Sequence, residues 1–422
     1  MSLLKLRFKD ESRQCFPEWK TKRLLDLAKV YDGTHMTPDY KVSGVPFFSV
    51  EHLTNNNFCD TKFISEDIFD KENKRVKLEK GDILMTRIGD IGTPKYINWD
   101  VRASFYVSLA LIKQSKNINS QYLSHFITTP YFQKELHQRT IHVAFPKKIN
   151  LGEISECLVQ FPSEPEQTKI ANFLTAVDEK IHLLTQKHDL LVKYKKGVMQ
   201  QIFSQELRFK DDDGQYFPEW EEKTMGDIFT FIQTNSFSRE LLSYETGIVK
   251  NIHYGDIHTK FKSNFKIDNE NVPFIKPNID LSKISADCYC KEGDLLIADA
   301  SEDYADVGKA IEIISLGNQK LLSGLHTYIA RDLSKLMSSG FSGYLMQTEK
   351  VRLQIKTLAT GVSVLGISKG NMSKVKLNIP TKPEQTKIVT FLTAIDNKIT
   401  ATQTQLKAVK QYKQGLLKQM FV

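Results

Sequence analysis

The stretch PEQTKIANFLTAVDEKI at residues 165–181 returns almost unchanged as PEQTKIVTFLTAIDNKI at residues 383–399. A second pair repeats in the same order, because LRFKDESRQCFPEW at residues 6–19 returns as LRFKDDDGQYFPEW at residues 207–220. Two copies are too few for a solenoid, which needs about three or more repeats to bury a continuous core. The chain is therefore predicted to be a duplication of one structural plan.

Each copy of the plan has a constant leading segment, a divergent body and a constant closing helix. Between the constant parts, KGDILMT at residues 80–86 matches EGDLLIA at residues 292–298, and both are typical of a strand. The predicted fold class is α+β, with two tandem mixed α/β domains separated by two long helices. The predicted boundaries are 1–160 for the first body, 161–206 for the central helical spacer, 207–378 for the second body and 379–422 for the C-terminal helical spacer.

The order of the repeats is circular. The first closing helix runs on through QQIFSQELRFKD at residues 200–211, whereas the second ends with KQMFV at residues 418–422. The missing LRFKD is found at residues 6–10 instead. We therefore expect the two termini of the chain to lie close together.

Both closing segments follow proline breakers and keep a seven-residue period of mostly apolar side chains without an internal proline. A period this long is typical of a two-stranded coiled coil, although each helix packing on its own globular domain is the alternative. The expected seam residues of the first helix are Ile170, Leu174, Val177, Ile181, Leu184, His188 and Leu191. Those of the second helix are Ile388, Leu392, Ile395, Ile399, Thr402, Leu406 and Val409.

If the two helices are antiparallel and overlap almost fully, Ile170 lies opposite Met420 and His188 lies opposite Thr402. A single polar layer of this kind fixes the register of a coiled coil at some cost in stability. Because a body precedes each helix, the antiparallel pair is expected to hold the bodies at opposite ends about an approximate twofold axis. Such an arrangement suits contact with two separated points on one long ligand.

The composition of the 422 residues suits a protein with a polyanionic partner. Lys and Arg number 58 against 50 Asp and Glu, which gives a net charge of +8 and a pI near 8.9. The amino end shows no cleavable apolar segment, and no run of about 18 apolar residues predicts a membrane span, so a cytoplasmic protein is expected. The five cysteines have no paired CxxC spacing, which argues against a disulfide framework or a zinc site.

The divergent bodies carry hydrogen-bonding side chains in polar, Gly-rich stretches, where a rigid scaffold often presents binding residues. Such side chains can contact phosphates or base edges. In the first body the candidate DNA-binding residues are Thr34, His35, Thr37, Thr86, Arg87 and Lys95. In the second body they are Asn251, His253, Tyr254, His258, Ser301, Lys309 and His326. The structural alternatives are buried, satisfied histidines at positions 35 and 326, and a strand-end salt bridge for Arg87.

The motifs of several enzyme classes are missing from the sequence. There is no GxxxxGK[ST] phosphate-binding loop, no Gly-rich cofactor loop, no [ND]PP[YF] adenine-methylation motif, no HExxH and no GxSxG. No catalytic residue, metal site or bound cofactor is therefore predicted for this chain. A binding protein is favoured over an enzyme.

On these repeats the chain resembles the specificity subunit of type I restriction-modification enzymes over essentially its full length. The resemblance rests on the doubled PEQTKI and FLTA(V/I)D segments, and on DGTHMTP, GDILMTRIGDIG, NIHYGDIH and GLHT in the bodies. It implies two target-recognition domains that each read one half of an asymmetric, bipartite site in double-stranded DNA. It does not transfer individual contact residues, because the bodies vary so much within the family.

The resemblance also implies partners. Two modification subunits would supply methylation with S-adenosylmethionine, and restriction subunits would use ATP and Mg to translocate and cut. The specificity subunit itself would be noncatalytic. Two alternatives stay open at this point: a self-contained DNA methyltransferase or nuclease with diverged motifs, and a scaffold that binds only protein.

Overall fold

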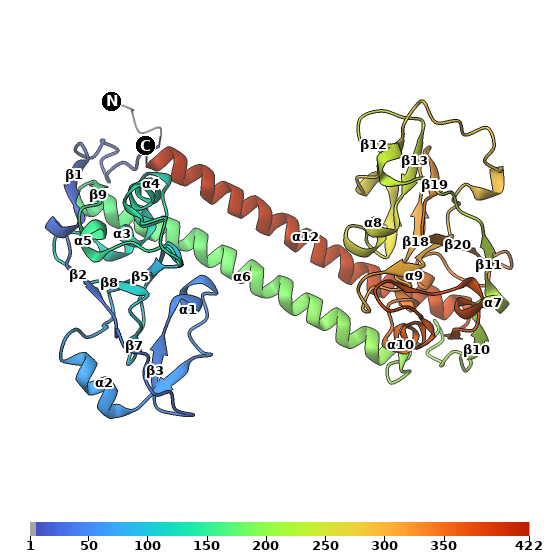
Figure 1. Cartoon of the computed structure of the whole chain (residues 1–422), viewed down its shortest axis with the longest axis horizontal. Helices are drawn as coiled ribbons and strands as arrows, with labels where there is room; N and C mark the ends of the chain where they lie inside the picture. Colours follow the sequence, from blue (N-terminus) through green and yellow to red (C-terminus); the bar gives the residue numbers. More distant parts are fainter. Residues whose placement is uncertain (1–5, 422) are drawn as a thin grey trace. The chain divides into compact units, whose positions relative to one another are not determined.

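The computed structural model describes residues 6–421, which fall into two compact units. The first unit contains residues 6–186 and 403–421, and the second contains Lys187–Thr402. Each unit thus includes one body together with half of each long helix, α6 (Glu164–Phe203) and α12 (Lys382–Met420). The mixture of helices and strands within each body confirms the predicted α+β class (Figure 1).

The body of the first unit is built on small, mostly antiparallel sheets, in the orders β2-β8-β5-β6, β4-β3-β7 and β1-β9. Only β3 and β7 pair in parallel among them. The strands are β1 (Lys20–Arg23), β2 (Val30–Asp32), β3 (Val45–Phe48), β4 (Lys62–Ile64), β5 (Ile83–Ile88), β6 (Asp90–Tyr96), β7 (Ser104–Phe105), β8 (Leu109–Ile112) and β9 (Leu158–Phe161). The helices are η1 (Leu24–Asp26), α1 (Val50–Thr54), α2 (Glu66–Asn73), α3 (Ser120–Ile127), α4 (Pro130–Arg139) and α5 (Leu151–Ser155).

The body of the second unit has a five-stranded sheet, β11-β20-β16-β18-β14, and a four-stranded sheet, β12-β15-β13-β19, with the pairs β10-β22 and β17-β21. The strands are β10 (Glu221–Thr224), β11 (Thr230–Ile232), β12 (Leu242–Ser243), β13 (Val249–Ile252), β14 (Asn264–Lys266), β15 (Phe274–Ile275), β16 (Leu295–Ala298), β17 (Ala300–Ser301), β18 (Ala310–Ser315), β19 (Lys320–Ser323), β20 (Thr327–Arg331), β21 (Leu365–Gly366) and β22 (Lys376–Ile379). The helices are α7 (Met225–Ile228), η2 (Arg239–Leu241), α8 (Tyr254–Thr259), η3 (Ile267–Asn269), η4 (Ala286–Cys288), α9 (Phe341–Leu345), α10 (Glu349–Leu358) and α11 (Lys369–Met372).

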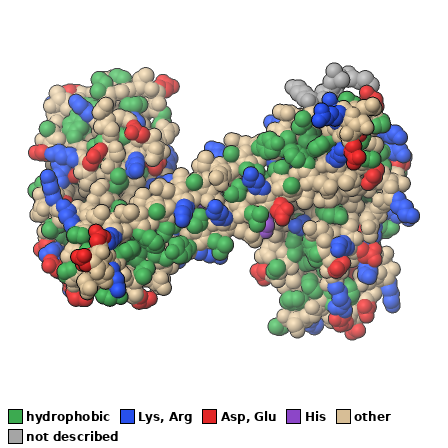
Figure 2. Space-filling model, turned by 180° about the vertical axis from the view of Figure 1, so that it is seen from behind, with side chains coloured by type: hydrophobic (Ala, Val, Ile, Leu, Met, Phe, Trp, Pro, Cys, Tyr) green, Lys and Arg blue, Asp and Glu red, His purple; other side chains and the backbone are tan. Residues whose placement is uncertain are grey.

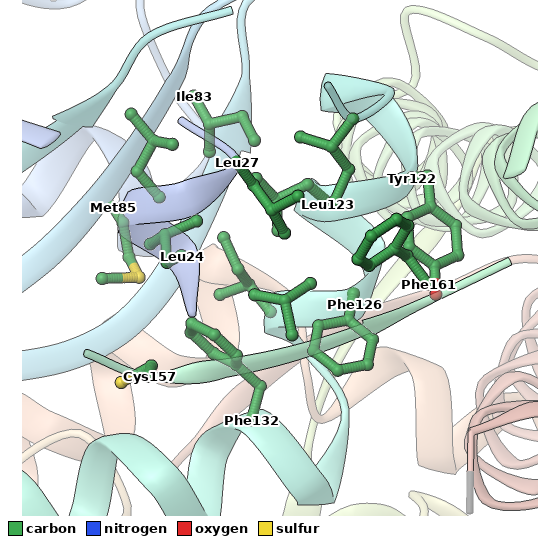
Figure 3. Close-up of a cluster of buried hydrophobic side chains, with 14 of the residues drawn as sticks. Leu24, Leu27, Ile83, Met85, Tyr122, Leu123, Phe126, Phe132, Cys157 and Phe161 are labelled. Carbon is green, nitrogen blue, oxygen red and sulfur yellow. The ribbon is translucent and has the colours of Figure 1, made fainter. Parts of the chain in front are cut away.

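The main core of the first unit joins its body to the helix pair. Leu27, which follows η1, lies beside Leu123 of α3 in Figure 3, and Phe126 of the same helix belongs to the same cluster. The same cluster continues into α6 through Leu174 and into α12 through Met420. Burying each large apolar side chain contributes about 1.5–3 kcal/mol, so the helix ends are integral to this unit.

The helices pack as an antiparallel pair, as the heptads predicted. Within the first unit the amino-terminal half of α6 lies beside the carboxyl-terminal half of α12, and within the second unit the halves are exchanged (Figure 1). All of the predicted seam positions are buried or half-buried. Matching ion pairs join the helices in the two units: Asp178 to Lys413 at 2.6 Å, and Asp396 to Lys195 at 2.7 Å.

The two conserved segments repeat because they bind each other. Arg7 donates from Nη2 and Nε to the fully buried carboxylate of Glu166, at 2.7 and 3.2 Å. In the second copy Arg208 donates to Glu384, which is also fully buried, at 3.1 and 3.4 Å. A buried carboxylate requires a paired cation, so the LRFKD and PEQ segments constrain one another.

The closing helix and the leading segment meet in the same way in both copies. In the second copy the chain is continuous, and Leu207 N–H donates to Gln201 O at 3.0 Å. In the first unit the equivalent bond joins Leu6 N–H to Gln419 O at 3.2 Å. The two ends of the described chain therefore lie together, which agrees with the expected proximity of the termini, although residues 1–5 and 422 lie outside the description.

Candidate nucleic-acid interface

The tip of the β5–β6 hairpin in the first unit carries Arg87, but this side chain is only 8% exposed. Its Nε donates to Val107 O and its Nη1 to Ile149 O, both at 2.9 Å. Desolvation lowers the pKa of the guanidinium. The hypothesis that Arg87 reaches a base edge is therefore not retained, because its donors are committed to backbone carbonyls. The alternative of a strand-end salt bridge is not seen either, because the hydrogen-bond partners of Arg87 are the carbonyls of Val107 and Ile149 rather than a carboxylate.

Arg87 instead fastens a second loop, residues 140–149, to the hairpin. Ile149 N–H donates to Arg87 O at 3.0 Å, and Gly89 N–H donates to Lys147 O at 2.9 Å. We call residues 140–149 the first tip loop. Sequence analysis missed this loop because it lies far from the hairpin along the chain.

Thr86 and Lys95 also have structural partners. Thr86 is fully buried, donates to Asp90 Oδ2 at 2.8 Å and accepts from Thr93 N–H at 2.9 Å, so it closes the hairpin and cannot contact a ligand as it stands. Lys95 donates to Asn56 Oδ1 at 2.7 Å, and desolvation lowers the pKa of its ammonium group. Lys95 is half-buried, so its role as a DNA contact stays a prediction.

The DGTHMTP stretch presents two of its three candidates to solvent. His35 Nε2 lies 2.6 Å from Asp32 Oδ2, and the histidine side chain is 68% exposed, which argues against the buried alternative. Thr37 Oγ1 lies 3.3 Å from the hydroxyl of Tyr106 on the exposed side of the body. Thr34 is buried, and its backbone pairs with Phe105 O, so this side chain is not available for contact.

In the second unit the structure brings four candidates into one cluster around Tyr254. The ring of Tyr254 lies 4.5 Å from that of His253, 5.7 Å from that of His258 and 5.4 Å from that of His326. Burial lowers the pKa of His253 and of His258, which favours their neutral forms. His253 Nδ1 already accepts from Gly255 N–H at 3.2 Å, so a ligand would meet this ring through Nε2, and His258 Nε2 is buried without a hydrogen-bond partner among the described atoms. His326 pairs through Nδ1 with Asp299 at 3.3 Å and is half exposed. This histidine–tyrosine cluster has the chemistry of a base-edge reader.

Three further candidates in this unit support the fold. Asn251 is fully buried and accepts from Asn235 at 2.8 Å, and Ser301 is buried and accepts from Asp303 N–H at 3.0 Å. Lys309 donates to His258 O and lies 3.3 Å from Asp306 Oδ1. Asn251 and Ser301 are therefore not retained as contacts, because neither side chain reaches the surface. Lys309 reaches the wall of a groove.

This groove has a volume of about 790 Å³ and lies between the second body and α12. Its lining contains one acidic side chain, Asp396, and the cations Lys195, Lys262, Lys266, Lys309 and Arg352. Lys195 is paired with Asp396 and Arg352 donates to the carbonyls of Ala305 and Val307, so Lys262 and Lys266 are the exposed cations of the lining. We call it the basic groove. The sequence offered only a weak signal, the lysines of TKFKSNFKI at residues 259–267, because Lys195 joins the lining from a distant helix.

Lys and Arg side chains are also spread over the face of both units in Figure 2. Within residues 6–421, no group of three or more His, Cys, Asp or Glu side chains is placed to hold a metal ion. In the same part of the chain, every helix is too short or too polar to cross a bilayer.

Known proteins share this architecture and its sequence pattern. The family model described as the type I restriction modification DNA specificity domain matches residues 17–192 and again residues 218–411. A putative type I restriction enzyme MjaX specificity subunit of Methanocaldococcus jannaschii is 21% identical over 418 residues, covering 95% of this chain and 92% of the relative. The MjaVIII specificity subunit of the same organism is 23% identical, with 95% and 91% coverage.

Solved structures show the same fold. The S subunit of a type I restriction-modification system from M. genitalium superposes with a TM-score of 0.61 at 15% identity, covering 99% of this chain and 98% of its own. A chain from a structure on complex assembly and conformational transition of the type I R-M system gives a TM-score of 0.52 at 14% identity, with 96% and 98% coverage. Because the family model matches both halves of the chain, this protein belongs to the specificity subunits of type I restriction-modification systems.

Proposed function

We propose that each unit of this specificity subunit reads one half of an asymmetric, bipartite site in double-stranded DNA. The observation that carries this proposal is that the two units repeat the same structural frame but present different exposed polar residues. Both units pair the same Arg and Glu and clamp the helices with the same ion pair, whereas the exposed polar residues of the two bodies differ. A constant frame with two different readers suits a target with two different halves.

The second unit reads its half-site through the histidine–tyrosine cluster and holds the phosphates through the basic groove. Neutral His253 offers its Nε2 to base edges, and the Tyr254 hydroxyl offers a donor and an acceptor, while His258 packs edge-on against the Tyr254 ring. In the first unit His35, Thr37 and Lys95 are the candidates that remain open to a ligand.

The chain assembles with two modification subunits, which supply S-adenosylmethionine chemistry, and with restriction subunits that use ATP and Mg. The repeated frame supports two modification subunits, since two like surfaces can bind two copies of one partner. The complex acts in the cytoplasm, and the base flipping that adenine methylation requires is completed by the modification subunits. The alternative of a self-contained methyltransferase predicts DNA methylation by the purified chain with S-adenosylmethionine alone.

The salt dependence of DNA binding by the assembled complex tests the basic groove. Replacing Lys262 and Lys266 with Gln removes two groove cations, so the slope of log K against log salt should become shallower by about 1.8 if each contacts a phosphate. The matched control is Lys283→Gln, an exposed lysine of the same unit outside the groove lining, which should leave the slope unchanged. Equal slopes in all three proteins would remove the groove from the proposal.

Methylome sequencing of a strain that carries this chain with its partner subunits tests the bipartite target. The expected result is methylation at one sequence made of two specified parts and an unspecified gap. A single uninterrupted motif, or methylation that is independent of this chain, would contradict the proposal.

A further inference from the structure

Each unit exposes apolar side chains at the tip of one loop, in positions that correspond between the two copies. In the first tip loop Val143 is 97% exposed and Phe145 is fully exposed. The corresponding segment of the second unit joins α10 to α11, and there Val362 is fully exposed and Val364 is half exposed. We call residues 359–367 the second tip loop.

Both tip loops are held firmly at their bases. The first is bonded to the β5–β6 hairpin through Arg87 and Gly89, as described above. In the second unit β21 pairs with β17, and Ile367 N–H donates to Asp299 O at 2.8 Å. Thr360 and Gly366 also exchange two backbone hydrogen bonds across the second tip loop, at 2.9 and 2.7 Å. Rigid bases under fully exposed apolar tips favour a role in contact rather than in packing.

The charges around the tips select the kind of partner. His142, Lys147 and Lys148 are exposed beside Phe145, and the first tip loop contains no acidic residue. The second tip loop also lacks acidic residues and is followed by Lys369. An apolar tip among cations suits a polyanion with an apolar interior, and duplex DNA is that ligand, because phosphates border its stacked bases.

We propose that the first tip loop is a wedge that inserts Phe145 into a base step of the DNA, while Lys147 and Lys148 hold the flanking phosphates. Partial insertion of an apolar side chain unstacks one step and kinks the duplex, which is easiest at flexible pyrimidine–purine steps. The second tip loop has shorter side chains, so Val362 contacts base or sugar edges without unstacking. The first half-site is thereby selected by its deformability as well as by base contacts. This inference rests on the proposed DNA-reading function.

The test uses the assembled modification complex and a duplex that carries the site found by methylome sequencing. 2-Aminopurine replaces one adenine at a time, since its fluorescence rises when the base is unstacked. The wild-type complex, stripped of S-adenosylmethionine to limit base flipping, should give a rise at one step of one half-site. Phe145→Ala should abolish that rise and weaken binding by about 5- to 100-fold.

Two matched variants separate the wedge from general effects. Phe145→Leu keeps an apolar wedge and should retain most of the fluorescence rise, whereas Lys147→Gln should weaken binding and reduce the salt slope while keeping the rise. Because Phe145 contacts solvent over its whole side chain, none of these variants should affect folding. Circular dichroism and assembly of the complex serve as controls.

Three other outcomes would contradict the insertion of Phe145 into the DNA, and they can be told apart. If the wild-type complex binds its site specifically without any localised rise, the wedge is wrong while the proposed function stands. If Phe145→Ala blocks assembly with the modification subunits and leaves DNA stacking unchanged, the tip is a protein contact. If the wild-type complex shows no sequence-specific binding, the proposed function itself fails.

Discussion

The ion pair between Arg7 and Glu166 leads to the most quantitative prediction. Replacing Arg7 with Ala leaves the fully buried Glu166 carboxylate without its cation, because both Nη2 and Nε donate to it. Breaking a buried pair by removing one partner costs about 3–5 kcal/mol. The Arg7 side chain is 22% exposed, so water can partly replace the guanidinium, and we expect the lower end, about 3 kcal/mol.

The second copy provides a matched comparison. Glu384 accepts from Arg208 and also from Trp220 Nε1 at 3.2 Å, whereas the corresponding Trp19 Nε1 has no hydrogen-bond partner among the described atoms. A hydrogen bond to a charged group contributes about 1.5–3 kcal/mol. Taking the lower end of that range, Arg208→Ala is therefore expected to destabilise its unit by about 1.5 kcal/mol less than Arg7→Ala does.

Hydrogen exchange measured by mass spectrometry is the appropriate assay, since a chain of two compact units need not unfold in one step. Arg7→Ala should accelerate exchange in residues 6–19 and in the first turns of α6, and should leave the second unit unchanged. The double variant Arg7→Ala with Glu166→Gln should recover part of the loss, because the buried charge is removed as well. A loss of stability below about 1 kcal/mol in Arg7→Ala would refute the reasoning. So would a double variant whose loss equals the sum of the losses in Arg7→Ala and Glu166→Gln measured separately.

Three further predictions concern His125 of α3, the register of the helix pair and the histidine–tyrosine cluster. Burial lowers the pKa of His125 to about 4, and Asp178 and Lys413 are the charged groups that face it. As the pH drops from 6.5 to 4, the unfolded chain takes up this proton before the folded chain does, so the stability of the first unit should fall by up to about 3 kcal/mol. Thermal melts at a series of pH values measure this loss, and His125→Gln should flatten it. Cysteines in place of His188 and Thr402 should crosslink under mild oxidation, and failure beside a crosslinked neighbouring layer would reject the expected register. Tyr254→Phe keeps the ring among its histidines but removes the hydroxyl, so methylome sequencing should show relaxed choice at one base of one half-site; equal changes in both halves would exclude this assignment.

The duplication, the fold class and the antiparallel helix pair could be predicted from the sequence. Each depends on local repetition: a heptad read along one helix predicts a seam, and the PEQ and LRFKD segments recur with few changes. The predicted seam positions of both helices, Ile170 to Leu191 in the first and Ile388 to Val409 in the second, are buried or half-buried as the seven-residue period requires. A helix face that is buried along its length shows as a regular spacing of apolar residues in the sequence. The helix seam could therefore be predicted without knowing which distant segments are in contact.

The choice of contact residues depended on tertiary structure. Arg87 was a reasonable candidate because it lies in a Gly-rich turn, yet its donors are bound by carbonyls of Val107 and Ile149, which approach only after folding. The basic groove is likewise assembled from Lys195 and from lysines far along the chain. Whether a polar side chain faces water or a buried carbonyl is decided by which distant segments pack around it, and a single sequence carries no periodic signal for that.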